Sequence, residues 1–596
     1  MADQLTRLKP RSDRSPGLVP RRPSRLRAPS PWTLAVAGVL LVTFLLRIWG
    51  VKHGMPYAFN ADENAHFVPK AIGLFGHGYN PHYFVNPPAY TYLLHIVFQV
   101  WFGGRDGVYE TYATNPTEVF VVARVTAGVC GTLAVWLLYV AGTRLFDRRV
   151  GLLAAALFGV SFLPIFYSHL ALNDVPTLAP ICLSLVGAAG ILRYGRVSDY
   201  LVAGAGLGLA AAFKYTGGIV ILPLIGAAAA QFLAPGGRSS AVRGLAFAGG
   251  AAFAGFLIAN PYALLSFSEF KDGLDHQTTV ADDAIGKLGL TQDNGVLYYL
   301  WTLTWGLGFV PAFAALGAVA VLWRDERRLI WVLAPAPIIF LLFMGSQTRF
   351  FGRWLIPVFP MICLLAAYGM LELAEAAGRR RPALRPTLLA VAALALCGQG
   401  IVSALHIGRV LSRPDTRNTT REWMVANIPP KSKIVVEPVV PDAWASDIGA
   451  PVLDGAGNGS RWVKFSTSRE NKDPVTGAVV PGAGAIVNVE NYEKALTPEL
   501  IDAYEAQKFC WVITGSTQRG RAEVEAKEVP KALEYYAELE KRGEVVHRDS
   551  PYAEGKGPVE FNFDWSFDYY PLDYARPGPL MVVYRLYGGR CAEIPR

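Results

Sequence analysis

The sequence predicts a polytopic α-helical membrane protein that carries a soluble α/β domain at its C-terminal end. Three observations predict this fold class. The chain is 52% apolar and only 17% charged, and its longest apolar segments reach the roughly 20 residues that cross a hydrocarbon core. Arginines gather in alternate connections between those segments. After residue 412 the composition becomes that of a water-soluble protein.

Eleven apolar segments are expected to cross the membrane. Two of them are short and adjacent, with a single lysine between them. The expected spans are 31–50, 119–142, 150–170, 174–192, 200–213, 216–233, 243–265, 296–322, 329–345, 354–374 and 386–411.

Arginine placement predicts the orientation. Clusters lie in the leader and in alternate loops, at Arg144, Arg148, Arg149, Arg193, Arg196, Arg238, Arg243, Arg324, Arg327, Arg328, Arg379, Arg380, Arg381 and Arg385. The positive-inside rule places these loops and the N-terminus on the cytoplasmic side of the cytoplasmic membrane. With an odd number of spans, the C-terminal domain is expected outside. Because the basic residues are split among short loops, the net charge of +9 indicates orientation and argues against a nucleic-acid partner.

Three regions follow from this pattern. Residues 1–30 are rich in proline and arginine and have no small-residue cleavage pattern behind them, so they predict a disordered basic cytoplasmic tail. Residues 31–412 form the transmembrane domain, with long outer connections at 51–118 and 266–295. Residues 413–596 form the soluble domain outside the membrane.

Secondary structure in the soluble domain is expected to alternate between helix and strand. The predicted helices are 415–427, 497–507 and 528–542, and the predicted strands are 433–437, 509–514, 543–547 and 579–587. Cys510 and Cys591 are the two cysteines of this region, and an outer, oxidising location favours a disulfide between them.

Both long outer connections are expected to cover the membrane domain. In 51–118, the Asn86-Pro87-Pro88 segment forbids a continuous helix, while apolar stretches around it suit helices that lie in the interface. The connection 266–295 is acidic and polar, and its length suits a lid over a substrate.

The acidic pair Asp62-Glu63, followed by His66, is the first candidate for chemistry. Carboxylates beside a bilayer are costly to desolvate, so their presence there suggests a function. Helical spacing would place Asp62 and His66 on one face, as a base and its orienting partner. The alternative is a helix N-terminus whose acids complement the macrodipole. A zinc peptidase is excluded because Asp62 stands where the His-Glu-x-x-His pattern needs histidine.

The second candidate is Asp174, which follows Asn173 in a short outer turn before a span. Both side chains are good helix caps, so a cap and a functional acid are equally compatible with this position. The third candidate is Lys214, which is followed by Tyr215 and two glycines that would let the backbone approach an anion. A lysine beside a span can also snorkel to the interface without binding a ligand.

The fourth candidate is the arginine pair Arg349 and Arg353 on the outer rim. Arginine on that side opposes the positive-inside bias, so an anionic ligand explains it, although contact with lipid headgroups would also do so. One outer acid and several cations around a cavity suit group transfer from a membrane-held phosphate. The cations stabilise the departing phosphate, and the carboxylate takes the proton of the incoming hydroxyl.

The order of these motifs resembles the family 39 glycosyltransferases of the GT-C fold, which include protein O-mannosyltransferases and aminoarabinose transferases. The similarity covers about residues 31–412. The segments that carry it are Asp62-Glu63, Tyr-Phe-Val-Asn-Pro-Pro-Ala-Tyr at 83–90, Ser-His-Leu-Ala-Leu-Asn-Asp at 168–174, Phe-Lys-Tyr-Thr-Gly at 213–217 and Arg-Phe-Phe-Gly-Arg-Trp-Leu-Ile-Pro at 349–357.

The resemblance implies an inverting transfer of a sugar from a polyprenyl-phosphate carrier to a hydroxyl outside the cytoplasmic membrane. It places the catalytic base on Asp62, a second acid on Asp174 and a donor-binding lysine on Lys214. Glu63 is a further candidate for catalysis, and Tyr215, Arg349 and Arg353 are further candidates for contact with the donor phosphate. The acceptor, whether cell-envelope glycan, lipid or protein, stays open, as does the sugar, hexose or pentose. The outer domain lacks the β-trefoil pattern of eukaryotic protein mannosyltransferases, which argues against a protein acceptor. A divalent metal ion, with His66 as a ligand or an orienting group, is also left open.

Two other functions compete with this hypothesis. A transporter or flippase for lipid-linked sugars would also use a membrane cavity, but it predicts internal symmetry and charges near span centres, and the sequence has neither. A non-catalytic subunit would bind glycan through the aromatic residues of the outer domain, namely Trp565, Tyr569, Tyr570 and Tyr574.

Overall fold

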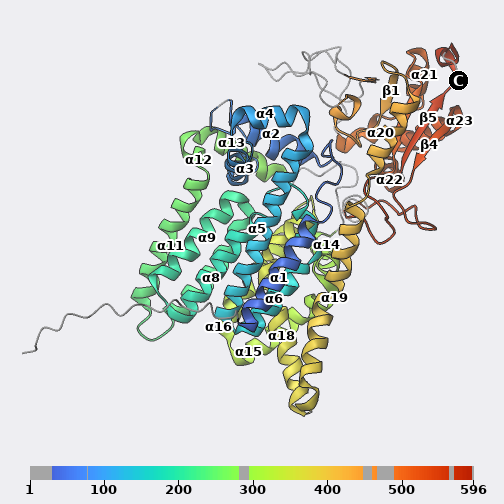
Figure 1. Cartoon of the computed structure of the whole chain (residues 1–596). Coiled ribbons are helices and arrows are strands. Elements are labelled where there is room, and N and C mark those ends of the chain that lie inside the picture. Colours follow the sequence, from blue (N-terminus) through green and yellow to red (C-terminus); the bar gives the residue numbers. More distant parts are fainter. Residues whose placement is uncertain are drawn as a thin grey trace, which may run out of the picture.

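The structure is a computed structural model of the chain. It describes residues 30–596 except 77, 281–293, 381, 448–459, 466–488, 563–568 and 594–596. The expected cytoplasmic tail therefore lies almost wholly outside the described residues. A helical bundle that ends at Leu411 is followed by a smaller part built on a β-sheet (Figure 1).

Each of the eleven predicted spans coincides with a helix or a pair of helices. Eight helical segments of the described chain are long and apolar enough to cross a membrane, and the bent pair α6–α7 makes a ninth. Helices α8 and α9 are shorter and apolar. The count of eleven stays a prediction. The bundle helices are α1 (Pro31–Ile48), α5 (Pro116–Leu145), α6 (Arg148–Val160), α7 (Phe162–Ser168), α8 (Leu178–Tyr194), α9 (Val197–Phe213), α10 (Ile221–Phe232), α11 (Arg238–Ala259), α14 (Gly295–Leu303), α15 (Phe309–Asp325), α16 (Arg327–Leu333), α17 (Pro335–Gly345), α18 (Phe359–Arg380) and α19 (Arg385–Leu411).

Small residues let the bundle helices approach closely. At Gly204 and Gly208 of α9, an added Cβ would lie 2.1 and 2.0 Å from the carbonyl oxygens of Ala248 and Ala252 in α11. Glycine is therefore required at both positions, as is typical of helix pairs in membranes, where packing and not water exclusion drives association.

The two outer connections are largely helical and pack against each other. The first contains α2 (Val68–Gly73), α3 (Ala89–Trp101) and α4 (Arg105–Thr114), and the second contains α12 (Tyr262–Leu265) and α13 (Phe267–Val280). Helix α3 begins directly after Pro88, as the proline pair requires. Phe84 of the first connection stacks edge-on against Phe270 of α13, with ring centroids 6.0 Å apart. Much of the expected lid, 281–293, lies outside the described residues.

A five-stranded mixed sheet organises the C-terminal part. The strand order is β2-β1-β3-β5-β4, with β1 parallel to β2 and β3, and β5 antiparallel to β3 and β4. Its elements are α20 (Thr416–Asn427), β1 (Lys433–Val436), β2 (Val463–Lys464), α21 (Glu499–Ala506), β3 (Trp511–Gly515), α22 (Ser516–Val524), α23 (Pro530–Arg542), β4 (Gly543–Asp549) and β5 (Met581–Leu586). The expected α/β alternation is confirmed, whereas β2 and α22 were not predicted.

Alternating side chains give this sheet two covered faces. Val435, Val512 and Val582 pack with α21 and α23, while Ile434 and Ile513 pack on the other side with α20. Burial on both sides explains why β1, β3 and β5 are nearly continuous apolar runs, whereas β4 at the edge is polar and has no fully buried residue. Directly before β3, a disulfide joins Cys510 to Cys591 with a Cα–Cα distance of 5.5 Å.

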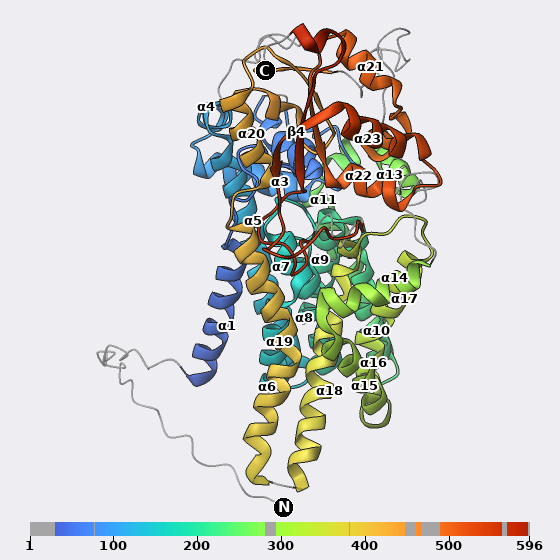
Figure 2. The ribbon, with the colours of Figure 1, turned by 90° about the vertical axis from the view of Figure 1, so that its right-hand side faces the viewer.

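The sheet domain rests on the first outer connection, at the end of the bundle where α3 and α4 lie (Figure 2). Asn418 of α20 donates a hydrogen bond of 2.8 Å to the carbonyl of Met55. The guanidinium of Arg417 lies 3.6 Å from the ring centre of Phe59. Tyr57 is part of the apolar cluster on the α20 side of the sheet, so the two parts share a core.

Candidate active site

Asp62 opens a π-helical turn that precedes α2. The turn spans Glu63–Phe67, and the Asn60 side chain accepts a hydrogen bond of 3.1 Å from the backbone N–H of Glu63. Asp62 still interacts electrostatically with His66, but the wider π turn changes the helical phase and its ion-pair partner is a more distant residue in the chain. Oδ2 of Asp62 forms an ion pair of 2.9 Å with Nη2 of Arg353, and 36% of the Asp62 side chain is exposed.

Arg353 reaches Asp62 from the first turn of a 3₁₀ helix, Gly352–Val358, that leads into α18. Its guanidinium lies 5.2 Å from the ring centre of Phe351 and 6.0 Å from that of Tyr167. The guanidinium of Arg349 covers the same Phe351 ring at 4.8 Å. The two arginines named by the sequence therefore share one aromatic support, and Arg353 is the one that pairs with the acidic loop.

A second ion pair joins the other two predicted residues. Lys214, in the break between α9 and the 3₁₀ turn Tyr215–Val220, forms an ion pair with Asp174 in the turn before α8. Both side chains are largely buried, with 13% and 3% of their surface exposed. Nδ2 of the neighbouring Asn173 donates to the carbonyl of Phe213 at 2.8 Å, which fixes the turn against the end of α9.

The two ion pairs belong to one cluster. Arg353 interacts electrostatically with Asp174 as well as with Asp62, and Lys214 interacts with Asp62 as well as with Asp174. Two acids and two cations from four separate segments therefore meet at one place. The sequence named all four residues, and the fold brings them together.

The electrostatics of the cluster keep Asp62 ionised. Desolvation raises the pKa of Asp62, but Arg353, with smaller contributions from His66 and Lys214, lowers it, and the net pKa lies below the ordinary value. A carboxylate in this state accepts protons only weakly on its own.

Glu63 has a different environment from its neighbour Asp62. It is fully buried, and its two oxygens accept hydrogen bonds of 2.6 and 2.7 Å from Nε and Nη2 of Arg124 in α5. Oε1 also accepts from the backbone N–H of Ala171 at 2.9 Å. These contacts tie the acidic loop to α5 and to the turn before α8. The sequence did not identify Arg124, although a lone arginine inside an apolar span was a usable signal.

His66 lies beside the cluster on an aromatic support. Its ring stacks on Tyr83 with centroids 4.7 Å apart and an interplanar angle of 10°. The ammonium of Lys70 also lies over the Tyr83 ring, 4.7 Å from its centre. Burial and Lys70 lower the pKa of His66, against the opposing effect of Asp62, so the imidazole is neutral near pH 7. Burial raises the pKa of Tyr83 to about 12.

Tyr215 was expected to contact the donor phosphate. Its hydroxyl donates a hydrogen bond of 2.8 Å to the carbonyl of Phe84 in the first outer connection. The same connection is held to α13 by His82, whose Nδ1 lies 2.9 Å from Oε2 of Glu269. Tyr215 therefore fixes the loop that carries Tyr83 and, through it, the surroundings of Asp62.

The residues present do not suit a resident metal ion. Among the described residues, no three His, Cys, Asp or Glu side chains lie close enough together to hold one. Asp62 and Asp174 are each neutralised by a cation, and His66 is stacked on Tyr83. We therefore derive no step through a metal.

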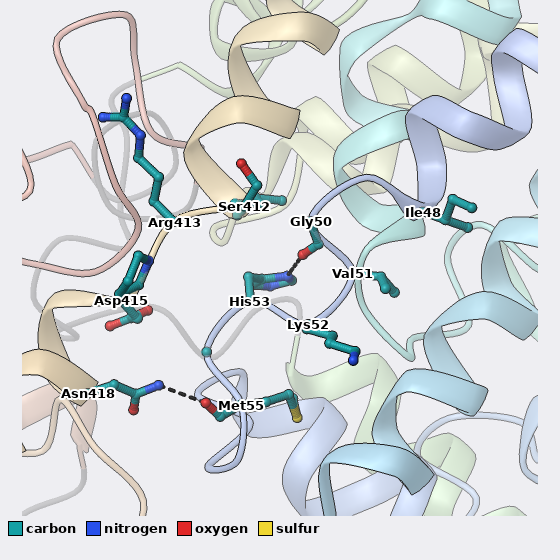
Figure 3. A pocket seen from close by; sticks show the side chains of 13 residues that line it. Ile48, Gly50, Val51, Lys52, His53, Met55, Ser412, Arg413, Asp415 and Asn418 are labelled. Atoms are coloured by element: carbon teal, nitrogen blue, oxygen red, sulfur yellow. Dashed lines mark hydrogen bonds between the residues drawn. The ribbon is translucent and has the colours of Figure 1, made fainter.

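A separate cavity of about 440 Å³ lies where α1 and α19 leave the bundle (Figure 3). Its lining comes from residues 48, 50–55, 411–415 and 418. Within it, Nδ1 of His53 lies 3.2 Å from the carbonyl oxygen of Gly50, which accepts the hydrogen bond, and Nδ2 of Asn418 donates to the carbonyl of Met55. The residues of the charged cluster do not line this cavity, which marks the joint between the bundle and the sheet domain.

Comparisons with known proteins give a family match and several structural similarities. A family model described as dolichyl-phosphate-mannose-protein mannosyltransferase matches residues 117–263, which include Asp174 and Lys214. No curated protein matches the chain.

Three solved structures illustrate the fold similarity. The oligosaccharyltransferase of Archaeoglobus fulgidus, tethered with an acceptor peptide, is similar with a TM-score of 0.50 and 12% identity, over 94% of this chain and 77% of that one. ArnT from Cupriavidus metallidurans, bound to undecaprenyl phosphate, has a TM-score of 0.46 and 14% identity, over 93% and 98%. The S. cerevisiae protein O-mannosyltransferase Pmt1-Pmt2 complex, bound to the sugar donor, has a TM-score of 0.33 and 20% identity, over 45% and 39%. The predicted resemblance to the family 39 glycosyltransferases of the GT-C fold is thus confirmed, by the family model over residues 117–263 and by the fold shared with the oligosaccharyltransferase.

Proposed function

We propose that the chain is an inverting glycosyltransferase that moves a sugar from a polyprenyl-phosphate carrier to a hydroxyl acceptor outside the cytoplasmic membrane. The observation that carries this proposal is the cluster in which Asp62 pairs with Arg353 and Asp174 pairs with Lys214. The family match over residues 117–263 supports the same class of donor.

Each member of the cluster has a distinct role in the proposed reaction. Asp62 accepts the proton of the acceptor hydroxyl as the hydroxyl oxygen forms a bond to the anomeric carbon of the sugar. The bond between that carbon and the phosphate oxygen breaks, and its electron pair leaves with the polyprenyl phosphate. Lys214 and Arg353 stabilise the negative charge that develops on the phosphate, with Arg349 beside them. Attack from the face opposite the phosphate inverts the anomeric configuration.

Arg353 links the base to the leaving group. Its guanidinium is paired with Asp62. A bound phosphate would draw this guanidinium away from the carboxylate, and the pKa of Asp62 would rise from its lowered value. Donor binding would in this way make Asp62 a better base when the phosphate is in place.

Asp174 and Glu63 are assigned positioning roles. Asp174 holds the Lys214 ammonium, which would otherwise lie uncompensated in a largely buried position. Glu63 has its oxygens bound to Arg124 and to Ala171, so we propose that it fixes the backbone of Asp62 and does not touch the substrate.

Turnover with a purified lipid-linked sugar tests the proposal. The protein is incubated with a panel of polyprenyl-phosphate sugars and a cell-envelope extract as acceptor, and labelled sugar transfer is measured. Asp62→Asn should lower the transfer rate by about 100- to 10,000-fold, because the general base is lost. Asp106→Asn, on the exposed face of α4, is the matched control and should leave the rate unchanged.

Two results would contradict this function. Transfer from a nucleotide sugar, with none from polyprenyl-phosphate sugars, would exclude the proposed donor. More than about a tenth of the original rate in Asp62→Asn would exclude Asp62 as the base, since base removal costs at least about 100-fold.

The orientation is proposed on independent grounds. The disulfide between Cys510 and Cys591 is compatible with an oxidising compartment outside the cytoplasmic membrane. A protease added to intact spheroplasts should therefore cut within residues 413–596. Cleavage in inverted vesicles alone would place the sheet domain in the cytoplasm.

A further inference from the structure

Tyr569 lies between strands β4 and β5 of the sheet domain in sequence, but its side chain packs in the apolar core of the bundle. It is 1% exposed and packs in the same cluster as the membrane helices. Its ring meets Phe166 of α7 edge-on with centroids 5.1 Å apart, and meets Trp305 at 4.9 Å. The aromatic residues of this stretch could form either a core or a platform for glycan, and Tyr569 has the core position. Trp565 lies outside the described residues.

The hydroxyl of Tyr569 reaches the support of Arg353. It lies 2.9 Å from the hydroxyl of Tyr167, in a hydrogen bond between two buried side chains. Tyr167 is in turn one of two rings that face the Arg353 guanidinium, which lies 6.0 Å from the centre of the Tyr167 ring and 5.2 Å from that of Phe351. A chain of contacts thus runs from the sheet domain to the arginine that pairs with Asp62.

Gly352, next to Arg353, provides a second contact with Tyr569. A Cβ added to Gly352 would lie 3.3 Å from the Tyr569 hydroxyl oxygen and 3.0 Å from the ring of Trp305. The backbone that carries Arg353 therefore lies directly against Tyr569, and glycine provides the space. Tyr569 touches both the backbone next to Arg353 and one of the rings that face its guanidinium.

Neighbouring contacts hold the Tyr569 segment in place. Nε2 of His406 in α19 lies 3.1 Å from the carbonyl oxygens of both Tyr570 and Pro571. The Tyr570 side chain hydrogen-bonds to Arg417, which is also paired with Asp415 at the start of α20. The segment is anchored from the bundle and from the sheet domain at once, so its position depends on how the two parts are docked.

We propose that Tyr569 is a positioning residue that holds Arg353 in the orientation needed to bind the donor phosphate. It acts through the hydroxyl of Tyr167 and through contact with Gly352. The inference rests on the proposed function, because it assigns Arg353 to the carrier phosphate. It gives the sheet domain a direct part in the reaction site, and separation of the two parts would loosen Arg353.

Binding of undecaprenyl phosphate by the purified full chain tests the inference without knowledge of the sugar or acceptor. Tyr569→Phe keeps the ring and removes the hydroxyl, so it should weaken binding by about 2- to 10-fold, the effect of one hydrogen bond. Tyr504→Phe is the matched control, since Tyr504 is a buried tyrosine in the core of the sheet domain whose hydroxyl interacts with another tyrosine, Tyr535. It should leave the affinity unchanged.

A double-substitution cycle separates positioning from general stability. In an Arg353→Lys background, whose ammonium cannot make the same planar contacts, Tyr569→Phe should change the affinity by less than about twofold. Fully additive losses, or a lowered melting temperature with unchanged affinity, would overturn the inference. Absence of carrier binding by the unsubstituted protein would overturn the proposed function and the inference with it, whereas binding that Tyr569→Phe does not affect overturns only the inference.

Discussion

Substitution of Glu63 can distinguish a structural role of this acid from a catalytic one. Its carboxylate accepts two hydrogen bonds from Arg124, at 2.6 and 2.7 Å, and one from Ala171, at 2.9 Å. Both members of the ion pair are buried, with 1% and 0% of their side chains exposed. Glu63→Gln keeps the shape of the side chain but leaves the Arg124 guanidinium without a compensating charge.

The expected cost of Glu63→Gln is large because the remaining charge stays buried. Removal of one partner from a buried ion pair typically costs about 3–5 kcal/mol, a substantial fraction of the stability of a folded domain. Arg124 also donates to the carbonyls of Val51 and His53, at 2.7 and 2.8 Å. Loss of its partner Glu63 would therefore also affect the start of the first outer connection. We therefore expect a clear fall in melting temperature.

Thermal unfolding of the detergent-solubilised protein is the assay, followed by carrier binding and transfer. Glu523→Gln is the matched control, because its partner Arg519 and Glu523 itself are 38% and 55% exposed. Exposed pairs contribute about 0–1 kcal/mol, so the control should unfold near the original temperature. The double change Glu63→Gln with Arg124→Met should recover part of the stability, since no unpaired charge remains.

Normal stability together with lost activity in Glu63→Gln would contradict the structural role of Glu63. If Glu63→Gln unfolds at the original temperature and binds carrier normally, yet loses transfer by more than about 100-fold, Glu63 is a catalytic acid. The anchoring role assigned to it would then be wrong.

Three further predictions concern charge and pH. Lys214→Ala should weaken polyprenyl-phosphate binding by about 10- to 100-fold, the loss of one charge-assisted contact, while acceptor binding stays the same in a competition assay. Because the pKa of Asp62 is lowered while Arg353 is paired with it, kcat/KM for the donor should not fall as pH decreases from 7 to about 5, which a rate profile at limiting donor checks. Burial raises the pKa of Glu437 to about 8, so the folded state retains a proton there. The free energy of unfolding should therefore fall as pH rises from about 4.5 through about 8. In Glu437→Gln, melting curves should lack this pH dependence.

The direction of the Glu437 effect follows from its contacts. Oε1 accepts from the Tyr536 hydroxyl at 2.6 Å and Oε2 accepts from the Gly515 N–H at 2.7 Å, and both bonds favour the charged form. Burial outweighs them and raises the pKa, and the nearby Glu493 adds to the rise, whereas Arg519 opposes it. Stability associated with the bound proton is complete below the unfolded pKa and is lost above the folded one.

Local pattern predicted the helices well because membrane spans depend on length and apolarity. The short segments 200–213 and 216–233 are helices α9 and α10 with a 3₁₀ turn, and Lys214 lies in the break between them. Strand β2 was missed because it has only two residues, Val463–Lys464, too few for any period to appear. The two covered faces of the sheet explain why β1, β3 and β5 were found as apolar runs.

Long-range contacts in the candidate site could be predicted only in part. The sequence indicated Asp62, Asp174, Lys214 and Arg353 because charges at the outer ends of spans are costly. It did not indicate which acid pairs with which cation, because the partners can lie far apart in sequence, as residues 62 and 353 do. The pairing of Asp62 with His66 was inferred from α-helical spacing, and the π turn at Glu63–Phe67 alters that spacing.

The inserted Tyr569 illustrates what a single sequence does not reveal. An aromatic residue in a polar loop has the same local pattern whether it covers a sugar or fills a core. Its location depends on how the sheet domain docks, and that docking depends on contacts such as Arg417 on Phe59. Arg417 and Phe59 are far apart in sequence, so no local sequence pattern predicts their contact.

Charge balance in the cluster links these observations. Two carboxylates and two cations give a net charge near zero before donor binds, which limits the cost of placing them beside a low-dielectric membrane. A phosphate must then compete with Asp62 for Arg353 and with Asp174 for Lys214. Removal of a carboxylate therefore acts in the opposite direction to removal of a cation: Asp62→Asn should bind carrier phosphate at least as tightly as the unsubstituted protein, whereas Lys214→Ala binds it more weakly. The Asp62–Arg353 pair thus weakens donor binding. It also keeps Asp62 a weak base until a phosphate has drawn Arg353 away, so proton transfer is coupled to the presence of donor.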